Sequence, residues 1–156
     1  MGISHLLKPQ AVLIQLEAHN SEEVIRILGS KLHELGFVKD NFVEATLARE
    51  ASMPTGLPLG GEFNAALPHV DIEYVNKPAL ALATLKHPVV FRNMVERDEE
   101  VPVRLVIMLA LDKPKSQVET LQQVAEVLQR PDIVAQLMEA QSPADVLAVL
   151  SSLESE

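Results

Sequence analysis

The spacing of apolar and polar residues in the first third of the chain predicts two helices. Apolar residues recur at helical intervals after Asn20 and Ser21, either of which can cap the helix, and Gly36 is suited to end it. A second helix is expected to begin near Asp40 and to end before the turn-forming residues 54–56. Both helices carry an apolar stripe, which indicates that each packs against another layer of the protein.

The middle of the chain is rich in strand-like segments. Residues 101–111 form a largely continuous apolar run, which is typical of a central strand covered on both faces. Shorter apolar runs, bounded by proline, glycine or polar residues, predict further strands. The expected strands are residues 11–16, 63–67, 78–85, 89–91 and 101–111.

Three more helices are expected in the last third of the chain. The first opens within residues 112–116, where Pro114 suits the first helical turn, and the second starts at Pro131. The third starts at Ser142, and the tail over residues 151–156 is expected to fray. Helices on both sides of a strand-rich middle predict an α/β protein: an α/β/α layered single domain with a central mixed β-sheet flanked by helices.

Length and composition favour one domain spanning residues 1–156. Of the 156 residues, 47% are apolar and only 3% aromatic, so a core of aliphatic side chains is expected over about residues 10–150. The absence of cysteine excludes disulfides and thiolate metal sites. The sequence has neither a Walker-type phosphate loop nor a glycine-rich dinucleotide signature, and its histidines lack metal-binding spacing. No cofactor and no metal are therefore expected.

Charge and hydropathy narrow the expected partners and location. The net charge of −9 argues against nucleic acid, which requires a basic face, and favours a basic partner protein. The longest apolar run, Leu105 to Leu111, is much shorter than the roughly 20 residues of a membrane helix. The beginning of the chain lacks a signal-peptide pattern. The sequence therefore predicts a cytoplasmic protein that does not insert into a membrane.

One histidine and one arginine form the candidate reactive site. His69 directly follows an apolar strand that ends at Pro68, and Arg49 lies near the end of the second expected helix. A neutral imidazole is a nucleophile near pH 7 and a guanidinium binds phosphoryl oxygens, so the pair suggests a phosphorylated histidine. Each residue has a structural alternative: His69 could simply bind a carbonyl, and Arg49 could pair with Glu50 or the helix end.

The sequence does not determine which groups contact the His69 ring. The ring nitrogen that is not the nucleophile should donate a hydrogen bond, which would fix the tautomer, and a backbone carbonyl and Asp71 are equal candidates for the acceptor. His87 could reach the site from a neighbouring strand. The remaining histidines are expected outside the site, in loops, at the terminus or on a solvated helix face: His5, His19 and His33.

The motifs around these residues together resemble the mannitol/fructose-type enzyme IIA of the phosphoenolpyruvate-dependent sugar phosphotransferase system (PTS). The resemblance rests on an Arg-Glu pair, a Thr-Gly pair and a Leu-Pro-His sequence in that order, and it covers about residues 10–150. It is strongest to the galactitol-specific subtype in four segments, residues 48–51, 54–56, 105–107 and 129–134. It implies the layered α/β/α fold expected above.

The resemblance implies a phosphotransferase that carries phosphoryl groups. His69 would accept a phosphoryl group from the histidine-carrier protein HPr and donate it to a cysteine of the partner IIB, which serves a membrane IIC transporter. Arg49 would stabilise the phosphoryl group. Gln117 stands where many relatives have a second histidine, and the galactitol subtype resembles this chain in that respect. Gln117 could contact the phosphoryl group or His69, or it could be an ordinary half-exposed glutamine.

Two other functions stay open at the level of sequence. A regulatory IIA-like protein would use the same phosphohistidine to control its binding to a target protein. A pure interaction module would have the fold but would not be phosphorylated. The transported sugar and the oligomeric state do not follow from the sequence.

Overall fold

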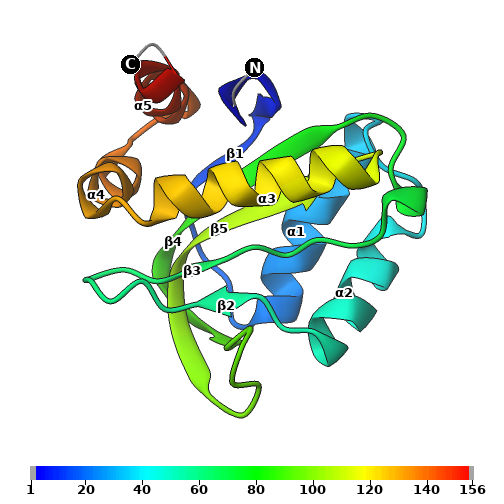
Figure 1. Ribbon diagram of the computed structural model, residues 1–156, viewed down its shortest axis with the longest axis horizontal. Helices are drawn as coiled ribbons and strands as arrows, with labels where there is room; N and C mark the ends of the chain where they lie inside the picture. The colour runs from blue at the N-terminus through cyan, green and yellow to red at the C-terminus, as the bar shows by residue number, and fades with distance from the viewer. Residues whose placement is uncertain (1–2, 155–156) are drawn as a thin grey trace.

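A mixed five-stranded sheet forms the centre of the computed structural model, which describes residues 3–154 (Figure 1). Neighbouring strands are parallel in the β1–β4 and β3–β5 pairs and antiparallel in the β4–β5 and β2–β3 pairs. The spatial order is β1 (Leu7–Leu16), β4 (Ala79–Arg92), β5 (Glu100–Ala110), β3 (Ala65–Ala66) and β2 (Gly56–Leu57). The predicted mixed sheet is confirmed.

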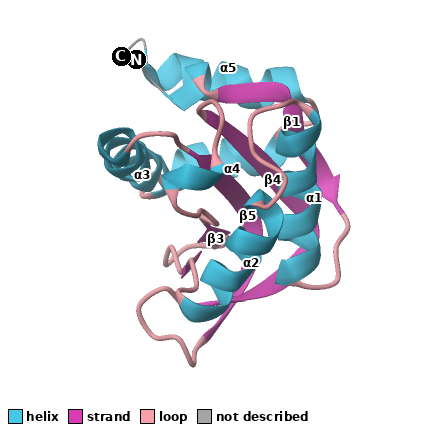
Figure 2. Cartoon of the chain, turned by 90° about the vertical axis from the view of Figure 1, so that its right-hand side faces the viewer, coloured by secondary structure: helices cyan, strands magenta, loops and turns pink. Residues whose placement is uncertain are grey.

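Five α-helices cover the two faces of this sheet (Figures 1 and 2). Helices α1 (Ser21–Glu34) and α2 (Phe42–Ser52) share one apolar cluster with one face of the sheet. The other face packs on α3 (Pro114–Leu128), α4 (Pro131–Glu139) and α5 (Pro143–Glu154). The predicted α/β/α layers are therefore confirmed. Two short 3₁₀ helices, η1 (Ile3–His5) and η2 (Ile72–Tyr74), were not predicted.

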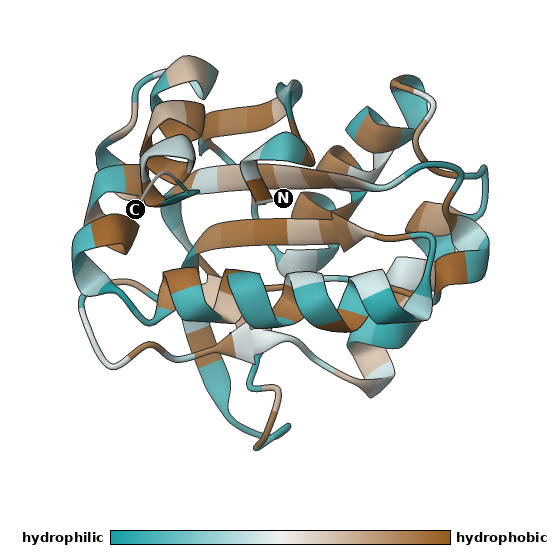
Figure 3. Ribbon diagram, turned by 45° about the horizontal axis from the view of Figure 1, so that its top comes forward, coloured by the Kyte–Doolittle hydropathy of each residue, from teal (hydrophilic) through white to brown (hydrophobic). Residues whose placement is uncertain are grey.

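The side chains of the central strands alternate between the two apolar clusters. Along β4, Ala79, Ala81 and Ala83 belong to the cluster on the α1 side, whereas Leu80 and Leu82 belong to the cluster on the α3 side. This alternation follows from the two-residue period of a strand. In the hydropathy colouring the central strands are largely hydrophobic, while α3 carries hydrophobic and hydrophilic patches along its length (Figure 3).

Local signals in the sequence account for the helix ends. The Asn20 side chain accepts a hydrogen bond of 2.9 Å from the backbone N–H of Glu23, so Asn20 is the cap of α1. Gly36 has φ +86°, a conformation that glycine adopts without strain, directly after this helix. Pro114 begins α3, where its missing N–H costs no helical hydrogen bond.

Several elements differ from the prediction. Strand β1 begins at Leu7 and not at residue 11, and β2 was not predicted. The expected strands 78–85 and 89–91 are one strand, β4, whose pairing with β5 shifts register between Thr84 and Val89, around Pro88, which has no N–H to donate. The expected strand 63–67 shortens to β3, although the Asn64 carbonyl still accepts a backbone hydrogen bond from Leu105 on β5. The Asn64 side chain accepts from the N–H of Leu59 and donates to the Pro102 carbonyl.

The C-terminal tail also differs from the prediction. The frayed tail expected over residues 151–156 is wrong as far as residue 154, since α5 continues to Glu154. The Glu154 carboxylate accepts hydrogen bonds from the backbone N–H and the hydroxyl of Ser4, which ties the two ends of the described chain together. Residues 155 and 156 lie outside the described residues. No helix between residues 3 and 154 is long and apolar enough to cross a membrane.

Candidate functional site

His69 lies just beyond the end of β3, where the backbone is still held by the sheet. The Pro68 carbonyl accepts a 3.0 Å hydrogen bond from the N–H of Leu109 on β5, and His69 forms an isolated parallel bridge with the same residue. Pro68 has no N–H, so the strand cannot continue its regular pairing. The sheet thus places the imidazole at the end of an inner strand, where it is half-buried.

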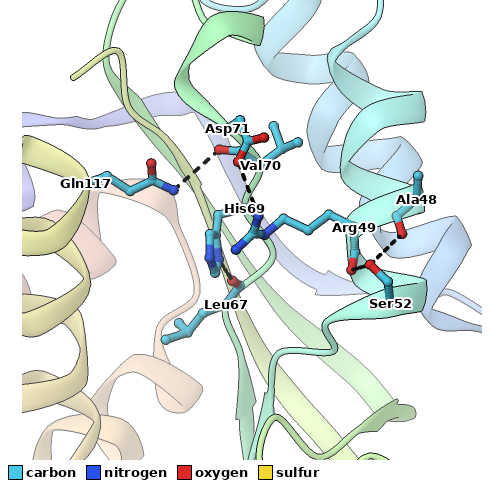
Figure 4. Close-up of polar contacts among 8 residues, drawn as sticks. All are labelled: Ala48, Arg49, Ser52, Leu67, His69, Val70, Asp71 and Gln117. Atoms are coloured by element: carbon cyan, nitrogen blue, oxygen red, sulfur yellow. Dashed lines mark hydrogen bonds and ion pairs between the residues drawn. The ribbon is translucent and has the colours of Figure 1, made fainter. Parts of the chain in front are cut away.

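The hydrogen bonding of the His69 ring identifies its reactive nitrogen. Nδ1 lies 2.7 Å from the carbonyl oxygen of Leu67 (Figure 4). A carbonyl only accepts, so Nδ1 carries the proton and Nε2 carries the lone pair of the neutral ring. Within residues 3–154, the hydrogen bond of the His69 ring is made by Nδ1, and Nε2 has no partner. The acceptor that the sequence left open is therefore the backbone carbonyl of Leu67 and not Asp71.

The surroundings of the ring favour its neutral, nucleophilic form. Burial lowers the pKa of His69 below its ordinary value, because a charged imidazolium loses solvation in this position. The hydrogen bond to Leu67 acts in the opposite direction; the Arg49 guanidinium lowers the pKa further and the Asp71 carboxylate raises it. The net effect is a lowered pKa, so Nε2 keeps its lone pair at neutral pH.

This lowered pKa gives a prediction about pH. On titration by NMR, the folded protein should keep His69 neutral as the pH falls through about 6.5, the ordinary histidine value, and protonate it only at lower pH. The matched control is the same protein unfolded in urea, where burial is lost and the midpoint should rise. A folded-state midpoint at or above the unfolded one would contradict the account of the site.

Arg49 projects from the last turn of α2 toward the imidazole (Figure 4). Its Nη1 lies 3.2 Å from Oδ1 of Asp71, and its Nε is buried and has no hydrogen-bond partner among the described residues. The helix end is fixed because the Arg49 carbonyl accepts from the N–H of Met53 at 2.6 Å and from the hydroxyl of Ser52 at 3.2 Å. The guanidinium therefore stands beside His69 with donor capacity to spare.

Gln117 approaches the same segment from the opposite side. It lies in the first turn of α3, and its Nε2 donates a long hydrogen bond of 3.4 Å to the carbonyl of Val70 (Figure 4). Gln117 thus contacts the backbone next to His69 and not the ring itself. The structure brings together all three predicted site residues, His69, Arg49 and Gln117, from three separate elements; their functional roles stay predictions.

A half-buried carboxylate, that of Glu50, connects α2 to the strand that carries His69. Both oxygens of Glu50 bind Thr55: the backbone N–H and the hydroxyl of Thr55 each donate at 2.8 Å. The Thr55 carbonyl accepts from the N–H of Leu67 at 3.3 Å, and the Leu67 carbonyl accepts from His69. Burial raises the pKa of Glu50, against the effect of the two hydrogen bonds from Thr55. Hydrogen bonds through Thr55 and Leu67 thus link Glu50 to His69, and Glu50 does not pair with Arg49.

The glycine of the Thr-Gly motif is required for space. A Cβ on Gly56 would lie 2.5 Å from the backbone carbonyl oxygen of Arg92, well inside contact distance. Gly56 therefore allows β2 to lie close to the end of β4, which places Thr55 next to Leu67.

The Thr55 hydroxyl should contribute measurably to stability. Thr55→Val keeps the shape of this buried side chain but leaves part of the half-buried Glu50 carboxylate without a donor, so the free energy of unfolding should fall by about 1–3 kcal/mol. Thr55→Ser, which keeps the hydroxyl, is the matched control. Urea unfolding measures both variants, and a Thr55→Val protein as stable as Thr55→Ser would contradict this role.

Comparison with known proteins identifies the protein family of this chain. The sequence profile of the family described as "Phosphoenolpyruvate-dependent sugar phosphotransferase system, EIIA 2" matches residues 5–153. The chain belongs to this family. The predicted resemblance is confirmed, and with it the general activity, since EIIA components are phosphotransferases in the relay that phosphorylates sugars.

Individual relatives of this EIIA chain agree in sequence and in fold. It is 34% identical over 116 residues to the galactitol-specific EIIA component of the PTS of Escherichia coli K12, which covers 74% of the chain and 76% of that protein. Its structure is similar to the IIA subunit in the complex of mannitol IIA with phosphorylated mannitol IIB from E. coli, with a TM-score of 0.76 and 27% identity over 94% of this chain and 99% of that one.

A third comparison supports the fold alone. The mannitol-specific cryptic enzyme IIA CmtB of E. coli is 21% identical to this EIIA chain, with a TM-score of 0.79 over 97% of this chain and 99% of that one.

The other histidines of this EIIA chain lie away from His69. His69 bridges Leu109 of β5, and Leu109 pairs with Leu80 of β4. His87 lies seven residues beyond Leu80 along β4. At about 3.3 Å per residue this places His87 roughly 20 Å along the strand. The remaining three are exposed, as expected: His5, His19 and His33. Between residues 3 and 154, no three His, Cys, Asp or Glu side chains are grouped so that they could hold a metal ion.

Sequence reasoning missed two features of the site. The pairing of Asp71 with Arg49 joins residues 22 positions apart, and no local pattern marks it. The binding of Thr55 by Glu50 joins residues only five positions apart, and a glutamate shortly before the Thr-Gly motif was the available signal. Both features depend on how the end of α2 is packed against β3.

Proposed function

We propose that this EIIA chain is the phosphoryl carrier of a galactitol-type sugar PTS, in which Nε2 of His69 accepts a phosphoryl group from phosphorylated HPr and donates it to a cysteine of the partner IIB. The observation that carries the proposal is the hydrogen bond from Nδ1 to the Leu67 carbonyl, which leaves Nε2 with its lone pair at a half-buried position beside Arg49.

The proposed transfer follows from this geometry. The lone pair of Nε2 attacks phosphorus in line with the bond to the donor histidine of HPr; the new N–P bond forms as the old one breaks, and its electron pair returns to the donor ring. The guanidinium of Arg49 neutralises the phosphoryl oxygens as their charge shifts. In the second step a thiolate of IIB attacks phosphorus, and the N–P electron pair returns to Nε2 of His69.

The choice of sugar rests on relatives. The galactitol-specific EIIA component of E. coli, at 34% identity, supports a polyol system of that type. The complex of mannitol IIA with phosphorylated mannitol IIB supports a IIB protein as the direct partner. The sugar itself would be bound by the membrane IIC component. This chain would therefore serve one particular sugar system because it transfers its phosphoryl group to the IIB protein of that system.

A stepwise reconstitution tests the proposal. The protein is mixed with phosphoenolpyruvate, enzyme I and HPr, and its intact mass is followed; then purified galactitol IIB is added. We expect one acid-labile phosphoryl group on His69, which passes to IIB. No phosphorylation by an active donor pair would contradict the carrier function. A stable phosphoprotein that passes nothing to IIB would indicate the regulatory alternative.

A further inference from the structure

The guanidinium of Arg49 is already engaged while His69 carries no phosphoryl group. Its Nη1 pairs with Oδ1 of Asp71 at 3.2 Å (Figure 4), and the two side chains are 31% and 65% exposed. The pairing is incomplete, because Nε is buried without a hydrogen-bond partner among residues 3–154. A guanidinium bound by one end has both a fixed position and unused donors.

Asp71 is held near the reacting atoms by the backbone that carries it. The segment 68–71 is fixed to β5 through the Pro68 carbonyl and to α3 through the Val70 carbonyl, so Asp71 stays two residues from His69. Its side chain, by contrast, is mostly exposed, and its only hydrogen bond within the described chain is the one from Arg49. The carboxylate can therefore lose Arg49 to a stronger anion and be hydrated by solvent.

We propose that Asp71 is a positioning residue that holds Arg49 beside the empty imidazole and then competes with the phosphoryl group for the guanidinium. The inference rests on the proposed function. As the N–P bond forms at Nε2 and the bond to the donor nitrogen breaks, Nη1 of Arg49 leaves Asp71 for a phosphoryl oxygen. When a IIB thiolate takes the phosphoryl group and the electron pair returns to Nε2, Arg49 returns to Asp71.

This competition has a consequence for the relay. The proposed move of Nη1 to a phosphoryl oxygen breaks the Arg49–Asp71 pair, so Asp71 makes the phosphohistidine less stable relative to the empty state. A carrier benefits from this, because a phosphoryl group held too strongly would not move on to the next protein. A partly exposed ion pair of this kind shifts an equilibrium by about two- to fivefold.

The test is the phosphoryl-exchange equilibrium between this protein and HPr. Asp71→Asn should shift the equilibrium about two- to fivefold toward the phosphorylated form of this protein, and Asp71→Glu, which can keep the pair, should stay near the natural protein. The matched control is Glu73→Gln, which removes the same charge from an exposed position two residues away. An equal shift in Glu73→Gln and Asp71→Asn would overturn the inference, because overall charge alone would then explain it.

A second comparison isolates Arg49. In an Arg49→Ala background, Asp71→Asn should no longer shift the equilibrium, because no guanidinium remains for Asp71 and the phosphoryl group to compete for. A shift that persists without Arg49 would overturn the inference, because Asp71 would then act on the phosphoryl group directly. The failure of the proposed function gives a different result: the natural protein itself would take no phosphoryl group from HPr.

Discussion

Replacing His69 with alanine is expected to abolish phosphorylation by HPr and to leave the fold intact. The variant removes the one nitrogen that the site presents as a nucleophile. The backbone at this point is held independently of the ring, by the bonds of Pro68 to Leu109 and of Val70 to Gln117. The free energy of unfolding should therefore change by no more than about 1 kcal/mol. Intact-mass measurement tests the loss of phosphorylation, and urea unfolding tests the unchanged stability.

His87→Ala is the matched control for the loss of an imidazole. His87 is exposed on β4, far along the sheet from the site, so this variant should accept a phosphoryl group at the rate of the natural protein. A phosphorylated His69→Ala protein would contradict the assignment of the carrier residue. Loss of phosphorylation in His87→Ala would show that the reaction extends beyond the site described here.

Arg49→Ala should slow phosphoryl transfer by about a hundredfold while the protein stays folded. Removal of one preorganised donor that stabilises developing charge typically costs this much in rate. Arg49→Lys should recover only part of the rate, because an ammonium offers a point charge where the guanidinium offers a planar fork. Rapid-quench measurement of a single turnover with phosphorylated HPr gives both rates.

Arg26→Ala provides the matched control for Arg49. Arg26 lies on α1 and pairs with Glu44 at 2.8 Å on the surface, so the variant removes the same charge away from His69. Its transfer rate should equal that of the natural protein. An Arg49→Ala protein that transfers as fast as Arg26→Ala would remove Arg49 from the mechanism.

Much of the fold was predictable because its signals are local. The apolar run of β5 indicated a strand covered on both faces, and Asn20, Gly36 and Pro114 marked helix ends through their own backbone preferences. The continuity of β4 and the shortness of β3 were not predictable in the same way. They depend on pairing with β5, which joins residues far apart in sequence.

The candidate site shows the same division. His69 and Arg49 were predicted from their order and from the family resemblance, and the structure places them side by side. The acceptor for Nδ1 was left open between Asp71 and a carbonyl, because the turn at Pro68 decides which oxygen meets the ring. The actual partner of Asp71 is Arg49, and this pair exists only once α2 has packed beside β3.

The most direct test of the central claim is to identify the phosphorylated atom. The protein, labelled with nitrogen-15 and phosphorylated by phosphoenolpyruvate, enzyme I and HPr, is examined by NMR for coupling between phosphorus and the ring nitrogens of each histidine. The account predicts coupling to Nε2 of His69, with Nδ1 still protonated against the Leu67 carbonyl. Coupling to Nδ1 of His69, or to a nitrogen of any other histidine, would contradict it.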